Sequence, residues 1–255
     1  MEMDLEKLEL DMQHRKQLKE DGYIVLKGFF KRKYIENLRK KAESVFQIQF
    51  ERFGYTGGFK ENMIRLFTEQ EEIFINCGKI IQSGLIELYK LPVEEKLINK
   101  IQDLGLEFPN LCTRPVLFFN HPKLARDEVY YKTPPHQDWP SMLSSMDSLV
   151  VWVPLVDVGK SNGSVIIWPG SHKKGPLPFV TKGGFANVET EGDGIQTELK
   201  IGDIVIFSTL LVHSSGDILD DSIRWSCHYR YTNMMEDDFI KRGFPNPYTY
   251  KPTTK

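Results

Sequence analysis

Residues 202–217, GDIVIFSTLLVHSSGD, contain the clearest strand pattern in the chain. Four apolar residues at 204–207 follow a Gly-Asp pair, and the segment ends in the turn formers Ser-Ser-Gly-Asp. A short β-branched and aromatic run between turn residues is typical of a β-strand. His213 lies between this run and the turn, so the segment is predicted to present an imidazole close to the end of a strand.

Further short apolar runs, each bounded by turn residues, fill the second half of the chain. They lie at 116–119, 149–153, 164–168 and 224–231. Several short strands separated by turn residues favour an antiparallel sandwich or barrel. Residues 181–193, rich in Gly, Thr and Glu, are interpreted as a surface insertion between strands.

The first hundred residues follow a different, mostly helical pattern. From residue 33, apolar side chains recur every three or four positions, which indicates one stripe of a helix. Pro at the start and Gly at the end of a segment mark helix boundaries. Helices are predicted at 12–20, from residue 33 onward, at 69–88 and between Pro92 and Gly105, and a strand at 23–26.

Composition excludes several classes of function. The chain has 255 residues, with 33 Lys and Arg against 35 Asp and Glu, so its net charge of −2 provides no basic field for nucleic acid. The longest apolar stretch, 149–156, is far too short to cross a membrane. The acidic N-terminus lacks a secretory signal, so a cytoplasmic location is expected. Three Cys without a CxxC spacing predict no disulfide framework and no thiolate metal site.

A single His-x-Asp, His136-Gln137-Asp138, is the strongest chemical feature of the sequence. Residues two apart in an extended segment point to the same side, so the imidazole and the carboxylate are predicted to face one point. His213 is the best third ligand. Two imidazoles and one carboxylate leave three positions of an octahedral ion open, a set that favours non-heme Fe(II) used for oxygen activation.

The open positions suit a five-carbon 2-oxo diacid that chelates iron and leaves one position for O₂. The distal carboxylate of such a molecule needs a cation, and Arg224 fits because arginine grips carboxylates through two parallel hydrogen bonds. Turn formers lie between His213 and Arg224. They are predicted to reverse the chain and bring Arg224 onto a neighbouring antiparallel strand.

The order of these motifs resembles one family. The motifs are TPPHQDW at 133–139, VWVPL at 151–155, IWPGSHK at 167–173, GDIVIF at 202–207 and HSS at 213–215, with an arginine eleven residues after His213. In this order they are similar to the phytanoyl-CoA dioxygenase family of Fe(II)/2-oxoglutarate oxygenases. The resemblance implies a mainly β fold, a double-stranded β-helix or jelly roll, with N-terminal helices flanking it.

The resemblance also implies roles for individual residues. His136, Asp138 and His213 would be the iron ligands, Arg224 would bind 2-oxoglutarate, and Ser215 and Trp152 would line the cosubstrate pocket. The expected organisation is one domain over 1–255, with helical support at 1–110, a jelly-roll core at 111–235 and a tail at 236–255. Trp139 is the best further candidate for a substrate contact, and His172 is interpreted as a structural hydrogen-bonding residue.

The implied activity is hydroxylation of a small-molecule C–H bond, with Fe(II), 2-oxoglutarate and O₂ as cofactor and cosubstrates and succinate and CO₂ as products. Related halogenases replace the carboxylate ligand by a small residue, so Asp138 favours hydroxylation. Desaturation or rearrangement by the same machinery stays open. A catalytically silent jelly-roll protein that retains a metal is a further alternative. A zinc hydrolase is disfavoured because no acidic residue beside His136 is placed as a general base.

Overall fold

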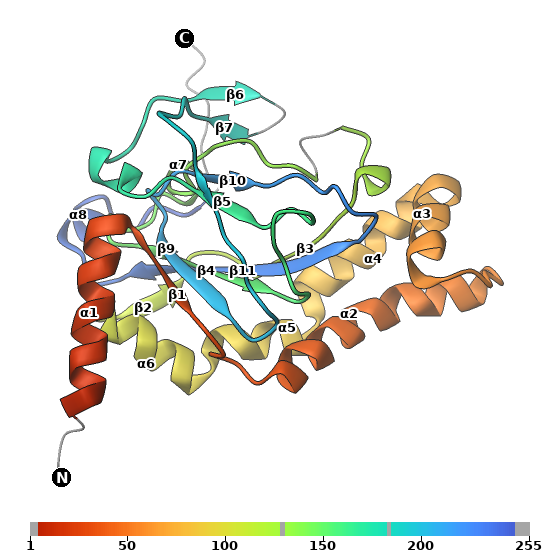
Figure 1. Cartoon of the computed structure of the whole chain (residues 1–255), viewed down its shortest axis with the longest axis horizontal. Coiled ribbons are helices and arrows are strands. Elements are labelled where there is room, and N and C mark those ends of the chain that lie inside the picture. The colour runs from red at the N-terminus through yellow and green to blue at the C-terminus, as the bar shows by residue number, and fades with distance from the viewer. Residues whose placement is uncertain (1–4, 128–130, 183–184, 248–255) are drawn as a thin grey trace.

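In the part of the chain that the structure describes, the fold consists of two main antiparallel sheets, a two-stranded hairpin and a layer of helices (Figure 1). The computed structural model describes residues 5–127, 131–182 and 185–247. The larger sheet has six strands in the order β1-β9-β4-β11-β2, with β3 also paired to β11. Its strands are β1 (Tyr23–Leu26), β2 (Pro109–Leu111), β3 (Val116–Asn120), β4 (Leu149–Pro154), β9 (Ile204–Ser208) and β11 (Arg224–Asn233).

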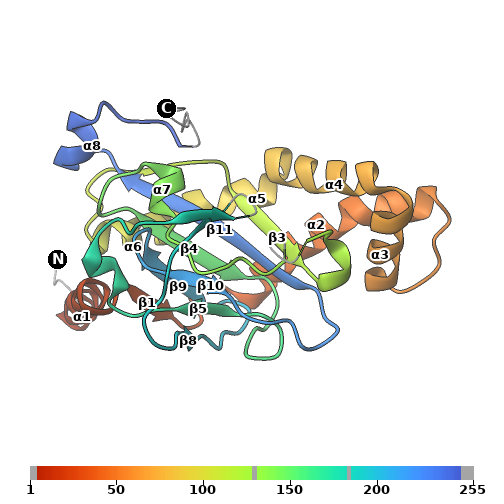
Figure 2. The same cartoon turned by 90° about the horizontal axis from the view of Figure 1, so that it is seen from above.

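The smaller sheet has the order β10-β5-β8 and lies over the larger one, as both views show (Figure 2). Its strands are β5 (Val165–Ile167), β8 (Ile195–Gln196) and β10 (His213–Ser215). A separate hairpin pairs β6 (Val180–Lys182) with β7 (Phe185–Asn187). Together with the flanking helices, this arrangement confirms the predicted mainly β, jelly-roll class.

Helices from the N-terminal part of the chain cover the face of the larger sheet that is turned away from the smaller one (Figure 1). The N-terminal helices are α1 (Leu5–Asp21), α2 (Arg32–Arg52), α3 (Phe59–Glu69), α4 (Glu71–Gly84), α5 (Ile86–Lys90) and α6 (Glu95–Asp103). Two short helices follow later, α7 (Trp139–Met142) and α8 (Asp237–Lys241). Every helix in the described ranges is too short or too polar to span a lipid bilayer.

The core divides into two layers, one on each face of the larger sheet. On β4, Val151 and Val153 pack with the helices, whereas Val150 and Trp152 belong to the apolar cluster that faces the smaller sheet. Strand β9 alternates in the same way. Both faces of these strands are therefore buried, which explains why their sequences are almost continuously apolar.

Strand β11 alternates differently, and this difference creates a polar cavity. Its apolar residues pack against the helices; they are Trp225, Cys227, Tyr229 and Tyr231. Successive side chains of a strand point to opposite faces, so the intervening polar residues face the smaller sheet. These residues are Arg224, Ser226, His228 and Arg230. The strand thus brings two arginines and a histidine into the space between the sheets.

The structure corrects several details predicted from the sequence. The predicted helix 69–88 is two helices, α4 and α5, separated at Leu85, whose backbone is extended. Helix α3 has no counterpart in the prediction. Residues 213–215, interpreted as the end of a strand and a turn, form strand β10, because their backbone pairs with β5. In the predicted tail 236–255, residues 237–241 form α8, and 248–255 lie outside the described residues.

The position of Arg224 also differs from the prediction. Its strand β11 belongs to the larger sheet, whereas the strand of His213 belongs to the smaller one. The connection between them crosses from one sheet to the other instead of forming a hairpin. Arg224 therefore faces the His213 strand across the cavity and not from a neighbouring strand.

The predicted surface insertion 181–193 is only partly correct. Residues 183–184 lie outside the described residues, but β6 and β7 on either side form a paired hairpin. Asn187 forms a β-bridge with His136, and Ala186 lines the cavity between the sheets. The segment therefore contributes to the site, because backbone pairing, which its polar composition did not reveal, holds it there.

We predict that Asp203→Ala destabilises the fold, because Asp203, just before β9, holds the segment that follows β1. The buried Asp203 carboxylate accepts hydrogen bonds from the backbone N–H groups of Gly28 at 2.8 Å and Lys200 at 2.9 Å, and from Lys27 Nζ at 3.1 Å. Leaving such donors without an acceptor costs about 1–3 kcal/mol each. Urea unfolding is expected to show a loss of about 2–4 kcal/mol. Glu191→Ala, at an exposed ion pair, serves as the control and is expected to change stability by less than about 0.5 kcal/mol; an equal loss in both variants would contradict the prediction.

Candidate functional site

His136 and His213 face each other as a pair fixed by the backbone. Each donates its backbone N–H to the carbonyl oxygen of the other at 3.0 Å, and their ring centroids lie 4.2 Å apart. His136 Nδ1 lies 2.8 Å from the carbonyl oxygen of Pro134, and His213 Nδ1 lies 3.0 Å from that of Leu211. Because a carbonyl only accepts, both Nδ1 atoms carry the proton. Each Nε2 therefore keeps its lone pair, as a metal ligand requires.

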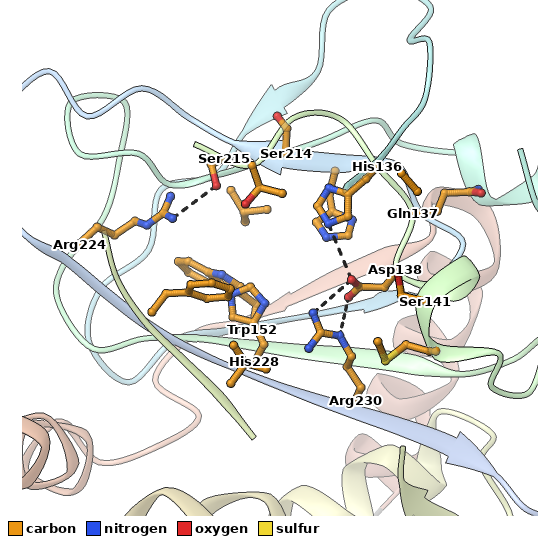
Figure 3. A pocket seen from close by; sticks show the side chains of 17 residues that line it. His136, Gln137, Asp138, Ser141, Trp152, Ser214, Ser215, Arg224, His228 and Arg230 are labelled. Atoms are coloured by element: carbon orange, nitrogen blue, oxygen red, sulfur yellow. Dashed lines mark hydrogen bonds and ion pairs between the residues drawn. The ribbon is translucent and has the colours of Figure 1, made fainter. Parts of the chain in front are cut away.

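Asp138 joins the two histidines to form a three-residue cluster. Its Oδ1 lies 3.7 Å from His136 Nε2, and one ligand atom from each of the three residues lies within 4.8 Å of the others. Gln137 has separate partners: its amide donates to the carbonyl oxygens of Gly175 and Leu210, and its Oε1 accepts from Leu177 N–H. Figure 3 shows Gln137 directed away from the cluster. The His-x-Asp spacing therefore brings its first and third side chains to one point.

Burial controls the protonation of the histidines. It lowers the pKa of His136, and it lowers the pKa of His213 to about 3. Burial alone would raise the pKa of Asp138, but the charge of Arg230 and the two neighbouring histidines hold it below its ordinary value. At neutral pH the cluster thus combines two neutral imidazoles with a carboxylate, a donor set suited to a divalent cation.

Arg230 is a residue that the sequence analysis missed. It donates from Nε to Asp138 Oδ2 at 2.9 Å and from Nη2 to Asp138 Oδ1 at 3.1 Å, and both side chains are buried. The position of Arg230 along its strand could have identified it from the sequence. Arg230 lies six residues after Arg224, so along one strand both must point to the same face.

Arg224, Ser215 and Trp152 also line the cavity that contains the cluster, which has a volume of about 190 Å³. Figure 3 shows Arg224 at one end and the Asp138–Arg230 pair at the other, with Trp152 between them. The buried Arg224 guanidinium donates from Nη1 to the carbonyl oxygen of Gly163 and from Nη2 to Ser215 Oγ at 3.4 Å. Burial lowers the pKa of Arg224 to about 10, so the group remains a cation at neutral pH.

The two ends of the cavity fit the two groups that the sequence implies, a carboxylate at one end and a metal ion at the other. In the part of the chain that the structure describes, Arg224 has only neutral hydrogen-bond partners, and its buried Nε has none. A buried cation is costly without an anion, so this end suits a carboxylate. At the other end, the three converging acceptors suit a metal ion.

His228 lies beside Trp152 in the same cavity, and the sequence analysis did not single it out. Its ring centroid is 4.9 Å from that of Phe118 and 6.2 Å from that of Trp152. Burial, and next to it the charge of Arg230, lowers the pKa of His228 well below its ordinary value, so the ring is neutral. Within the described residues its buried Nδ1 has no hydrogen-bond partner.

Trp139 and His172 lie outside the cavity. Trp139 is not among the lining residues; its Nε1 donates to the carbonyl oxygen of Ser144, and Arg242 lies over its ring at 5.5 Å. Contrary to the sequence interpretation, Trp139, the first residue of helix α7, does not line this cavity. His172 Nε2 contacts the carbonyl oxygen of Lys19 at 3.2 Å, which confirms its structural role.

Comparisons with solved structures show the same fold in proteins crystallised with 2-oxoglutarate. An epimerase, SnoN, in complex with Fe³⁺, alpha ketoglutarate and nogalamycin RO superposes with a TM-score of 0.61 at 20% identity, over 90% of this chain and 85% of SnoN. EctD from S. alaskensis, with 2-oxoglutarate and 5-hydroxyectoine, superposes with a TM-score of 0.59 at 16% identity, over 88% of this chain and 76% of EctD.

Sequence comparisons give the family. Human peroxisomal phytanoyl-CoA dioxygenase is 23% identical over 253 residues, which cover 86% of this chain and 68% of the human protein. The 1-deoxypentalenic acid 11-beta-hydroxylase of Streptomyces exfoliatus is 30% identical over 100 residues, 34% of this chain and 35% of that enzyme. The model of the phytanoyl-CoA dioxygenase family matches residues 18–226, a span that includes the His-Asp-His cluster and Arg224. This chain therefore belongs to the phytanoyl-CoA dioxygenase family.

Proposed function

We propose that the chain hydroxylates a C–H bond of a small molecule and couples this to the conversion of 2-oxoglutarate and O₂ into succinate and CO₂. Family membership makes the chain a 2-oxoglutarate-dependent oxygenase that uses Fe(II) and O₂, as the sequence predicts. The observation that carries the proposal is the convergence of His136, Asp138 and His213 in one cavity with the buried Arg224.

Within this proposal, His136 Nε2, Asp138 and His213 Nε2 hold Fe(II). Bound iron with 2-oxoglutarate supplies the activation of O₂ that protein side chains lack. Arg224 binds the distal carboxylate of 2-oxoglutarate, and Ser215, which accepts from Arg224, fixes the direction of the guanidinium. Trp152 forms the wall between the two ends and excludes water from this part of the cavity.

Asp138 favours hydroxylation over halogenation, because it supplies the carboxylate ligand that a halide would otherwise replace. Desaturation and rearrangement use the same ligands. A solved structure with the same fold is that of an epimerase, so product analysis has to separate these outcomes. A silent metal-binding protein has no use for a buried cation facing the metal cluster, and Arg224 therefore argues against that alternative.

The proposed function predicts a spectroscopic signal. Anaerobic addition of Fe(II) and then 2-oxoglutarate to the purified protein is expected to produce a weak visible charge-transfer band, since the 2-oxo acid chelates the iron directly. Succinate in place of 2-oxoglutarate is the control and should give no band. Admission of O₂ should then release succinate, at a rate that rises with the correct substrate. A folded protein that shows neither band nor succinate would refute the proposal.

A further inference from the structure

The contact between Arg230 and Asp138 has a geometry that bears on how the carboxylate binds a metal. Two adjacent nitrogens of the guanidinium each contact a different carboxylate oxygen, at 2.9 and 3.1 Å. This is the side-by-side pairing of an arginine fork with a carboxylate. In this pairing the guanidinium lies in front of the carboxylate. At this edge, one lone pair of each carboxylate oxygen points toward the same partner.

That same side is the one from which a carboxylate chelates a cation with both oxygens. With Arg230 in place, a metal reaches Asp138 only through the outer lone pair of one oxygen. Oδ1, which lies 3.7 Å from His136 Nε2, faces the histidine pair. Oδ2 accepts from Arg230 Nε.

The surrounding structure holds Arg230 firmly. The backbone of Arg230 pairs with Val150 in the β4–β11 ladder, and the carbonyl oxygen of Arg230 accepts a hydrogen bond from the N–H of Cys112. The side chains of Arg230 and Asp138 are 9% and 6% exposed, so water does not compete for the pair. Figure 3 shows Arg230 reaching Asp138 from the β11 side, opposite the strand that carries Ser214 and Ser215.

We propose that Arg230 is a positioning residue that restricts Asp138 to one-oxygen metal ligation. The consequence follows from counting positions on an octahedral ion. Two imidazoles and one carboxylate oxygen leave three positions, which suffice for a chelating 2-oxo acid and O₂. Ligation through both carboxylate oxygens would leave two, and the 2-oxo acid alone would fill them. This inference rests on the proposed metal site, and it assigns to Arg230 the task of keeping the third position open.

The test counts the waters on a bound metal, which requires no turnover. Mn(II) takes octahedral coordination, as Fe(II) would at this site, and reports its exchangeable waters through the relaxation rate of solvent protons. In the wild-type protein, addition of 2-oxoglutarate to the Mn(II) complex is expected to reduce this relaxation and leave the contribution of one water. In Arg230→Met the Mn(II) complex is expected to have about one third less inner-sphere relaxation than wild type, since two of three waters remain. Addition of 2-oxoglutarate to this variant should displace the two remaining waters and remove the remaining inner-sphere relaxation.

Two further variants make the outcome decisive. Arg230→Lys keeps the positive charge but engages only one oxygen, so it should resemble Arg230→Met if the fork is what matters. Arg230→Lys also allows the relaxation measurement to be made if Arg230→Met does not fold. Arg65→Met, at an exposed ion pair on α3, is the control and should match wild type. Wild-type relaxation in both Arg230 variants would overturn the proposal, even if their stability falls. Failure of the wild-type protein to bind Mn(II) would instead refute the metal site itself.

Discussion

Asp138→Ala is expected to lower 2-oxoglutarate-dependent succinate release by more than about 100-fold. Substitution of a residue that only supports a metal ligand already costs 10–100-fold in metal affinity or activity, and Asp138 is proposed to be a ligand itself. Two imidazoles alone hold Fe(II) weakly. Metal titration followed by intrinsic tryptophan fluorescence should show a matching loss of affinity, since Trp152 lines the same cavity.

The structure adds a second effect of the same substitution. If Asp138 acted only as a metal ligand, Asp138→Ala would fold almost normally. Asp138, however, accepts two charge-assisted hydrogen bonds from the buried Arg230. Removal of one partner of a buried ion pair costs about 3–5 kcal/mol, so urea unfolding is expected to show a loss of that order.

The double variant Asp138→Ala/Arg230→Met separates the two effects. It removes the buried guanidinium together with the carboxylate, and replacement of a buried ion pair by apolar groups is often neutral. We expect the double variant to regain most of the stability and none of the activity. Retained activity in Asp138→Ala would exclude Asp138 as a ligand, and wild-type stability would show that the ion pair contributes little.

Arg224→Met is expected to raise the 2-oxoglutarate concentration required for half-maximal activity by about 100-fold. A hydrogen bond to a charged group contributes about 1.5–3 kcal/mol, and about 1.4 kcal/mol corresponds to a factor of ten. Arg224→Lys keeps the charge but loses the fork, so we expect a smaller increase of about tenfold. Activity at saturating cosubstrate should fall much less, because Arg224 lies at the opposite end of the cavity from Asp138.

Titration of the anaerobic Fe(II) complex, followed by its charge-transfer band, measures the binding of the 2-oxo acid directly. A monocarboxylic analogue such as 2-oxobutyrate tests whether Arg224 acts by binding the distal carboxylate. It lacks the distal carboxylate, so the wild-type preference for 2-oxoglutarate over this analogue should largely disappear in Arg224→Met. Arg65→Met serves as the control on the surface. An unchanged preference in Arg224→Met would exclude Arg224 from binding the distal carboxylate.

Much of the site can be predicted from local patterns. The spacing of His136 and Asp138 already places both side chains on one side of an extended segment. The turn-bounded run at 204–207 marks strand β9. Each of these inferences depends on near neighbours in the chain, whose relative directions the backbone geometry fixes.

Arg230 and His228 show where a local pattern was available but insufficient. Both follow Arg224 at even spacing along one strand, so their common face follows from the sequence. That this face lies toward a cavity, with the helices on the other side, depends on which apolar residues the helices cover. The pairing of Arg230 with Asp138 joins positions 92 residues apart, and no periodicity predicts it.

The sequence by itself determined the strand pattern, the alternation that directs individual side chains, and the order of residues that suit iron and a 2-oxo diacid. Only the tertiary structure decided that β10 and β11 lie in different sheets, that Asn187 of β7 pairs with His136, and that Arg230 occupies one side of the Asp138 carboxylate. The reason is physical. Backbone stereochemistry fixes directions over a few residues, whereas contacts between distant segments depend on how the sheets and helices pack to bury their apolar faces.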